Sequence, residues 1–335
     1  MKLIKIIPLP SFASLLFVGL FSVAAANSAP GQLAAPPQKP ANTAPQGIPA
    51  FEIAPINSSS WYGRFGVTLC SWIDLGDGVM VIDTGATAAD AANLLAQIKE
   101  TTHGKPVKWI VITHSHQDSN GGFPAFLPTD ATVFVHHKAS AMVGAAVAKP
   151  GKGIKTPTVV GVSDKVFVIS GIHGVEIGTM PGHTDSDLYA HVAESGALFV
   201  GDLVTPGLCP VMSDPTADPK AWLAALDRIE SFHPALIIPT RGEPSQPVET
   251  SIATTRKYIR RILDEVVKAK KGNYPDSRVS GELAMQKLGD YCPSQLDAMN
   301  ALSVYHRISA DGTVRVPEAK SPIPPAKRSA PATKK

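Results

Sequence analysis

The chain of 335 residues carries a formal net charge of +3 at neutral pH, and 18% of its residues are charged. Part of the positive charge lies at the two ends, and a cluster of basic residues at 256–261 falls within one predicted helix, where a solvated helix face accounts for it. Because no basic patch is interleaved with aromatic residues, we expect no nucleic-acid partner.

The first 26 residues have the features of a cleavable secretory signal. Lys2 and Lys5 precede an apolar run that extends to Phe21, and the alanines at 24–26 are the small residues that a signal peptidase requires. An uncleaved anchor is the alternative, but the run is short for a membrane span of about 20 residues. We therefore expect residues 1–26 to be removed, with no transmembrane span in the mature chain and a periplasmic or secreted location.

Two proline-rich segments flank the remainder of the chain. Residues 27–50 contain six prolines and few large apolar side chains, which predicts a linker, and residues 316–335 mix proline with lysine, which predicts a disordered tail. Length alone would allow two domains, but single α/β domains of about 200–250 residues are common. We expect residues 51–315 to form one domain with a C-terminal helical extension.

Buried strands and helices alternate within this domain. The apolar patterns predict strands at 78–85, 108–113, 131–137, 175–180, 189–194, 197–202 and 235–242. They predict helices at 88–100, from Asp218 and Pro219 onward, at 246–271 and at 294–309. Strands that end in polar residues indicate a layered α/β fold with its chemistry on the loops.

The segment THSHQDSNGG at 113–122 is the strongest functional motif. His114 and His116 can turn two imidazoles toward one ion, and Asp118 lies on the same tight loop. We expect Gly121 and Gly122 to let the backbone turn sharply after it. A pair of surface histidines is the alternative interpretation of this fragment taken alone.

Two further strand ends carry side chains that bind metals. His183 stands in PGHTDSD after one predicted strand, and Asp202 ends another in LFVGD. A helix cap or core histidine, and a turn-forming aspartate, are the ordinary alternatives. Because several strand ends offer ligand types in order, we predict a metal site formed by His114, His116, His183, Asp118 and Asp202.

These motifs resemble the metallo-β-lactamase fold superfamily. The order of Asp83 in VIDTG, then THSHQDS, PGHTDSD and VGDLV, is similar to the order of ligands in that family, and the resemblance covers residues 51–242. It implies a four-layer αββα sandwich with hydrolytic chemistry on zinc at one sheet edge. It also implies that Asp83 supports the metal-binding loop. The fold does not choose among lactams, lactones, thioesters and phosphoesters.

The chain departs from the family pattern at two positions. Ser119 stands where a further histidine is expected, and Arg241 in PTRG stands where the final histidine is expected. Both lost imidazoles belong to the second metal site, so we expect one tightly bound zinc and a weak or absent second ion. A guanidinium can replace the second ion as counter-charge for Asp118 and Asp202. The alternative is that Arg241 is a surface residue.

Three histidines leave a fourth position open on zinc, whose bound water has a pKa of about 7. Asp118 would orient the resulting hydroxide or accept its proton, and Arg241 would stabilise an oxyanion or hold a substrate carboxylate. We therefore expect a zinc hydrolase of small carbonyl substrates, with β-lactams, lactones or thioesters as candidate classes.

Two other questions stay open at the level of the sequence. The alternative function is a non-catalytic or weakly active accessory protein of this fold, for example one associated with a quinoprotein system. The three cysteines, Cys70, Cys209 and Cys292, allow at most one intramolecular disulfide, and the sequence does not say which pair forms it.

Overall fold

A computed structural model describes residues 51–127, 129–147, 156–171, 173–285 and 292–315. The predicted signal peptide at 1–26, the linker at 27–50 and the tail at 316–335 lie outside the described residues. Within these described ranges, no helix has both the length and the apolar character needed to cross a membrane.

The first sheet has seven strands that lie side by side in chain order. They are β1 (Phe51–Asn57), β2 (Ser60–Phe65), β3 (Thr68–Asp74), β4 (Val79–Ile82), β5 (Val107–Val111), β6 (Thr132–His136) and β7 (Thr158–Val162). Strands β1 to β4 pair antiparallel, whereas β4 to β7 pair parallel. Parallel neighbours need long crossovers, and the helix α1 (Ala88–Thr101) makes the first of them.

The second sheet has five strands in the order β12-β11-β10-β9-β8. They are β8 (Lys165–Ser170), β9 (His173–Thr179), β10 (Leu188–Val192), β11 (Ala197–Gly201) and β12 (Leu236–Pro239). The first four pair antiparallel, and β12 joins β11 in parallel through the helix α4 (Pro219–Ser231). The predicted start of α4 is confirmed, because Asp218 caps it and Pro219 is its first residue.

Three apolar cores separate four layers. In β4, Val79 and Val81 belong to the core shared with α1, while Met80 and Ile82 belong to the core between the two sheets. This alternation follows from the two-residue period of a strand that is buried on both faces. The third core lies between the second sheet and the helices α4 and α5, so the predicted αββα sandwich is confirmed.

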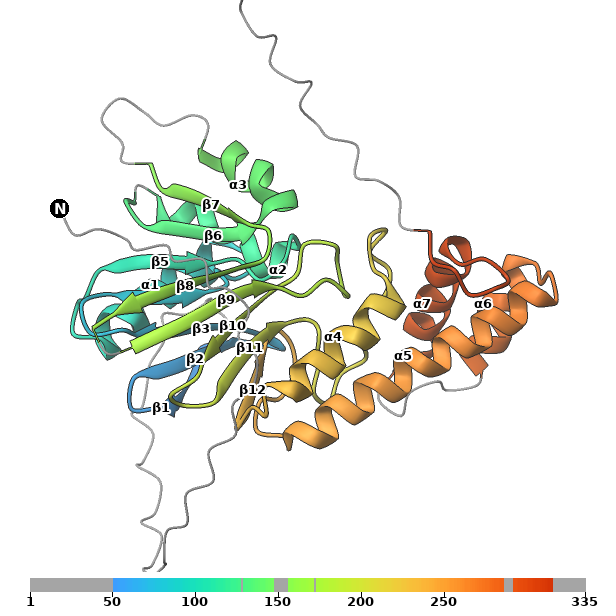
Figure 1. The fold of residues 1–335 in the computed structure, drawn as a ribbon. Helices are drawn as coiled ribbons and strands as arrows, with labels where there is room; N and C mark the ends of the chain where they lie inside the picture. The colour runs from blue at the N-terminus through green and yellow to red at the C-terminus, as the bar shows by residue number, and fades with distance from the viewer. Residues whose placement is uncertain (1–50, 128, 148–155, 172, 286–291, 316–335) are drawn as a thin grey trace, which may run out of the picture. The chain divides into compact units, whose positions relative to one another are not determined.

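The chain ends in three helices beyond the last strand. They are α5 (Val248–Lys271), α6 (Asp276–Met285) and α7 (Ser294–Arg307), and Figure 1 shows α4 and α5 running beside each other. Cys209 and Cys292 form a disulfide, and Cys70 is free and buried. The prediction of at most one disulfide is confirmed, and the structure identifies the pair.

The predicted strands and helices are confirmed, but some elements were not predicted. Strands β1 to β3, β7 and β8 and the helices α2 (Gln117–Asn120), α3 (Ser140–Val147) and α6 are additions. In β8 the apolar side chains of Phe167 and Ile169 are 51% and 75% exposed while Ser170 is buried, so the hydrophobic pattern does not follow the burial. Strand β1 is an edge strand that contains Pro55, a residue that edge strands tolerate.

Candidate metal centre

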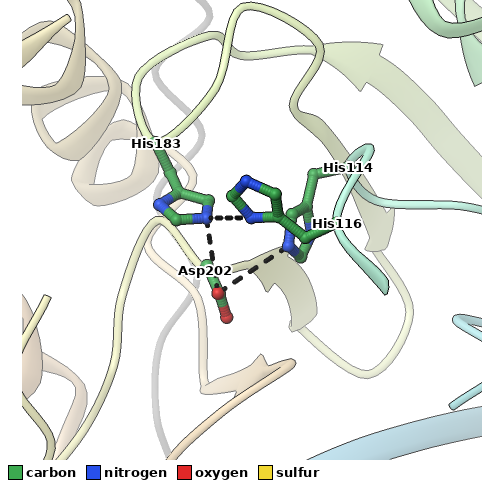
Figure 2. A group of neighbouring side chains, drawn as sticks. All are labelled: His114, His116, His183 and Asp202. Carbon is green, nitrogen blue, oxygen red and sulfur yellow. Dashed lines mark hydrogen bonds and ion pairs between the residues drawn. The ribbon is translucent and has the colours of Figure 1, made fainter. Parts of the chain in front are cut away.

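Four side chains meet at the ends of strands from both sheets (Figure 2). His114 and His116 follow β5, His183 follows β9, and Asp202 follows β11. One ligand atom from each lies within 4.8 Å of the others, so this group could hold a metal ion. His183 Nε2 lies 3.0 Å from His116 Nδ1 and 3.4 Å from Asp202 Oδ2.

The second ring nitrogen of each histidine is held by a group that accepts a hydrogen. His183 Nδ1 lies 3.0 Å from the carbonyl of Val211, which can only accept, and His116 Nε2 lies 2.8 Å from Asp214 Oδ2. The pKa of Asp214 is lowered: burial raises it, but hydrogen bonds from His116 and Thr216 outweigh burial, so the carboxylate is ionised and also accepts. Therefore Nδ1 of His116 and Nε2 of His183 carry lone pairs in the neutral rings.

His114 is oriented from the first sheet by a chain of hydrogen bonds. Its Nδ1 lies 3.0 Å from Thr113 Oγ1, and that hydroxyl donates to Asp83 Oδ2 at 2.8 Å, so it accepts from the imidazole. His114 Nε2 is then left facing the pocket, where it is buried without a hydrogen-bond partner.

Asp83 is fully buried behind the ligands. Its carboxylate accepts from the backbone and hydroxyl of Thr113, from Ser119 Oγ and from Thr240 Oγ1. Burial raises the pKa of Asp83, while the charge of His114 and these donors lower it. Asp83 also has a φ of 60°, a strained conformation for a residue other than glycine. The hydroxyl of Ser119 thus faces Asp83 and forms part of the support behind the loop.

Arg241 lies between the two carboxylates of the site. Its Nε donates to Asp202 Oδ2 at 2.7 Å, its Nη2 also contacts that oxygen, and its Nε lies 3.4 Å from Asp118 Oδ2. The backbone around it pairs with the start of β3, because Leu69 N donates to Thr240 O and Gly242 N donates to Val67 O. The alternative of Arg241 as a surface residue is wrong, since the guanidinium is held at the site.

Charges around the pocket favour a cation at its centre. Burial lowers the pKa of His114, but the Asp118 carboxylate, 3.5 Å from Nε2, and the charges of Asp202 and Asp83 outweigh it and raise the pKa to about 9. Burial is the main reason that the pKa of His183 falls to about 3. The surroundings of His114 therefore favour a positive charge on its ring, whereas the ring of His183 stays neutral.

The donor set fits a metal ion. Of the four buried side-chain atoms without a hydrogen-bond partner in the described part of the chain, three lie here: His114 Nε2, Asp118 Oδ1 and Asp202 Oδ1. Such orphaned atoms are costly unless an ion or water satisfies them. The gap of 3.0 Å between the facing nitrogens is close to the roughly 3.4 Å that separates two nitrogens on tetrahedral zinc.

Gly121 and Gly122 allow the backbone after the motif to lie against the backbone of residues 84–86. Residues 121–122 form the expected turn, but neither glycine has a positive φ: the values are −63° for Gly121 and −82° for Gly122, so the turn itself does not require glycine. A Cβ on Gly121 would lie 2.1 Å from Ala86 O, and one on Gly122 would lie 2.1 Å from Thr84 O. The short helix α2 (Gln117–Asn120) can therefore pack against the loop that carries Asp83 only if both residues are glycine.

Two residues that hold the histidines, Asp214 and Val211, carry no signal in the sequence. Asp214 Oδ1 accepts from the backbone and hydroxyl of Thr216, as an ordinary turn-forming aspartate does, so no local signal distinguishes it. Val211 contributes only its carbonyl oxygen, to which its side chain gives no clue.

The family comparison agrees with this geometry. A family model described as the metallo-beta-lactamase superfamily matches residues 63–241, just over half of the chain. The chain belongs to the metallo-beta-lactamase superfamily. The match ends at Arg241, so the helices α5, α6 and α7 lie outside the region that defines the superfamily.

Solved structures of the superfamily share the fold. The metallo-beta-lactamase from Pontibacter korlensis superposes with a TM-score of 0.53 at 23% identity, over 63% of this chain and 99% of that chain. The FIM-1 enzyme from Pseudomonas aeruginosa, in its mono-zinc form, gives a TM-score of 0.52 at 21% identity, over 65% and 97%.

Two curated relatives are similar in sequence. The linear primary-alkylsulfatase of Pseudomonas sp. (strain ATCC 19151) is 22% identical, over 66% of this chain and 51% of its own length. The probable metallo-hydrolase YqjP of Bacillus subtilis (strain 168) is 23% identical, over 57% and 74%. This chain thus spans about half the length of the alkylsulfatase.

Proposed function

We propose that this protein is a zinc-dependent hydrolase of small carbonyl substrates, with one zinc held by His114, His116 and His183. One observation carries the proposal: His116 Nδ1 and His183 Nε2 face each other at 3.0 Å although the hydrogen of each neutral ring is committed elsewhere. Two lone pairs at that distance repel unless a metal ion lies between them or one ring takes up a proton, and a metal ion would also satisfy the orphaned Nε2 of His114. Three neutral nitrogens with an open fourth position are typical of catalytic zinc.

Zinc, when bound, would supply Lewis-acid polarisation and lower the pKa of water to about 7. The chain's own residues would position the reactants. Burial raises the pKa of Asp118, but the nearby imidazole of His114 and the charge of Arg241 lower it well below its usual range. A carboxylate this acidic holds a proton poorly, so Asp118 would orient the attacking water through Oδ1, which accepts no hydrogen bond from the chain.

Arg241 would act as an internal cation. Its pKa is raised: burial lowers it, but the charges of Asp202 and Asp118 and the hydrogen bond to Asp202 prevail, so the guanidinium stays charged. It neutralises two carboxylates that a second metal would otherwise bind, and its side chain is 21% exposed. That exposed part can bind an anionic group of the substrate or stabilise developing negative charge.

Metal analysis and turnover test this function together. We expect about one zinc per chain to survive dialysis, with hydrolysis of at least one member of a panel containing a chromogenic cephalosporin, a lactone and a thioester. His116→Ala should lose both zinc and hydrolysis. His173→Ala is the matched control, because His173 is paired with Glu194 at 2.9 Å and belongs to no metal group.

Two results would contradict the proposal in different ways. Two zinc ions that survive dialysis would exclude Arg241 as a substitute for the second ion. Stoichiometric zinc without turnover would favour the alternative of a non-catalytic accessory protein. A sulfate ester belongs in the panel because one relative is an alkylsulfatase, and cleavage of that ester alone would exclude the carbonyl class.

We also propose that the protein is exported and cleaved after Ala26. The disulfide between Cys209 and Cys292 supports this, because disulfides persist mainly in oxidising compartments. The mass of the protein from a periplasmic or secreted fraction should correspond to a chain that begins at Asn27. A chain that retains Met1 in the membrane fraction would contradict cleavage.

A further inference from the structure

One loop holds two of the three histidines. This histidine-holding loop, residues 203–218, connects β11 to α4. It supplies the Val211 carbonyl to His183 and the Asp214 carboxylate to His116. These two contacts determine which nitrogen of each ring carries the lone pair that a metal needs.

The loop is in turn held by the last helix of the chain. Asn300 of α7, which is fully buried, accepts from Met212 N at 2.7 Å and donates from Nδ2 to Pro210 O at 2.8 Å. Arg307, also of α7, donates from Nη2 to Met212 O at 2.7 Å and from Nη1 to Ala217 O. These hydrogen bonds reach backbone groups of Pro210, Met212 and Ala217, which lie before and after Val211 and Asp214 in the chain. The helix α7 therefore fixes the path of the loop on both sides of the two groups that hold the histidines.

A covalent bond and a buried charge strengthen this connection. Cys209, at the start of the bonded segment, forms its disulfide with Cys292, two residues before α7 begins. Arg307 is only 8% exposed, and a buried guanidinium is tolerated only when its hydrogens are satisfied. A helix that only covered the core would not need two buried polar side chains, Asn300 and Arg307, bonded to the backbone of one loop.

We propose that α7 and the Cys209–Cys292 disulfide form a clamp that positions the metal ligands His116 and His183 through the histidine-holding loop. Asn300 and Arg307 are positioning residues in this proposal. Both α7 and Cys292 lie outside residues 63–241, the part of the chain that matches the superfamily, whereas Cys209 and the loop lie inside it. The inference rests on the proposed metal centre, because its consequence is a change in metal affinity.

His114 provides an internal reference. Its Nδ1 is held by Thr113 Oγ1, which is supported by Asp83 and lies at the end of β5. The clamp therefore predicts that a change in α7 disturbs His116 and His183 and leaves His114 as it is. A general loss of stability would not distinguish among the three rings.

Variants of the clamp test this with zinc alone as the probe. Arg307→Met removes the two hydrogen bonds donated to the loop, together with two donated to Ser303 of the same helix. The double variant Cys209→Ser/Cys292→Ser removes the covalent bond without leaving thiols that could themselves bind zinc. Tyr305→Phe is the control, because Tyr305 Oη donates to Tyr274 O at 2.5 Å on a different contact of the same helix.

Zinc affinity is measured at pH 7 against a chromophoric chelator, and histidine tautomers are measured in the metal-free protein by long-range ¹H–¹⁵N correlation. Both clamp variants should bind zinc about 10–100-fold more weakly, the range observed when the partners of metal-binding histidines are lost. Their spectra should show mixed tautomers at His116 and His183 and the parent ¹⁵N shifts at His114. Tyr305→Phe should match the parent, and Arg307→Lys should recover part of the affinity.

Each outcome decides the inference. Folded clamp variants with parental zinc affinity and parental tautomers would overturn it, as would an equal loss of affinity in Tyr305→Phe, which would reduce α7 to general stabilisation. If Arg307→Met does not fold, the double serine variant gives the same comparison. If the parent itself binds no zinc, the proposed function fails, but the tautomers of His116 and His183 still test the clamp.

Discussion

The pocket has two halves that differ in charge: one consists of three histidines, and the other of two aspartates and an arginine. On one side, the rings of His114, His116 and His183 lie edge to face, with centroids 4.8–5.1 Å apart, and together with Asp202 they could hold a metal ion. On the other side, Asp118 and Asp202 already have a cation, because Arg241 lies between them. In the proposed function, a bound metal completes the first half, whereas the guanidinium of Arg241 supplies the charge of the second.

With Ser119 and Arg241 at the positions where two histidines are expected, the carboxylates of Asp118 and Asp202 still have a counter-charge, which Arg241 supplies. A second zinc would have only carboxylates as protein ligands and would lie beside a fixed guanidinium, so like charges would repel. Arg241 cannot be deprotonated near neutral pH, so its guanidinium keeps the positive charge that a second metal ion would otherwise supply.

Removing the internal cation should have the largest effect on stability. In metal-free protein, Arg241→Met leaves the buried Asp202 and its neighbour Asp118 without their counter-charge, which typically costs about 3–5 kcal/mol. Urea unfolding of metal-free parent and variant measures this loss. Saturating zinc should shrink it, because the ion then compensates both carboxylates. An unchanged free energy of unfolding in both conditions would place Arg241 outside the electrostatics of the site.

Converting the cation into a ligand should recreate a second metal site. Arg241→His removes the obligatory positive charge and adds an imidazole beside Asp118 and Asp202. Calorimetric titration of the zinc-depleted variant should show a second binding event that the parent lacks. Arg241→Met is the matched control, since it removes the charge without adding a ligand. A single event in all three proteins would contradict the view that Arg241 stands in for an ion.

Ser119 should matter to the fold more than to the metal. Its hydroxyl donates to buried Asp83, so Ser119→Ala should lower the free energy of unfolding by about 1 kcal/mol, as expected when one hydrogen bond is lost. Zinc stoichiometry should not change, because the side chain faces away from the ligand atoms. A loss of zinc comparable to that of His116→Ala would instead make Ser119 part of the metal site.

A histidine outside the site should give a small acid-dependent effect. Burial, followed by the charges of His137 and Lys138, lowers the pKa of His136 from 6.5 to about 4. The unfolded chain then binds a proton that the folded chain does not, so stability contributed by neutral His136 is present above pH 6.5 and is lost as the pH falls toward 4.

His136→Asn tests this pH dependence. Its unfolding free energy should fall less steeply than that of the parent between pH 6.5 and 4, and the two curves should run parallel above pH 7. Parallel curves over the whole range would show that His136 is as readily protonated in the fold as in the unfolded chain.

Much of the fold followed from local pattern. The apolar runs of β4, β5 and β11 are short and bounded by turn residues, and α4 begins with its own cap, so each could be predicted without knowledge of its neighbours. The edge strand β1 and the exposed strand β8 gave no such signal, because partial burial does not produce a regular hydrophobic pattern. Their place depends on the sheets that they join.

For this protein, the sequence by itself determined the chemical types at the site: three histidines and two aspartates at strand ends, with a serine and an arginine in place of two expected histidines. These are local facts, because each residue occupies the end of an element that its own segment forms. Only the tertiary structure decided that Cys209 bonds to Cys292, that Asp214 holds His116, and that Arg307 reaches the loop beside Asp214. Such contacts join segments about a hundred residues apart, and they depend on how the layers pack, which no stretch of sequence specifies alone.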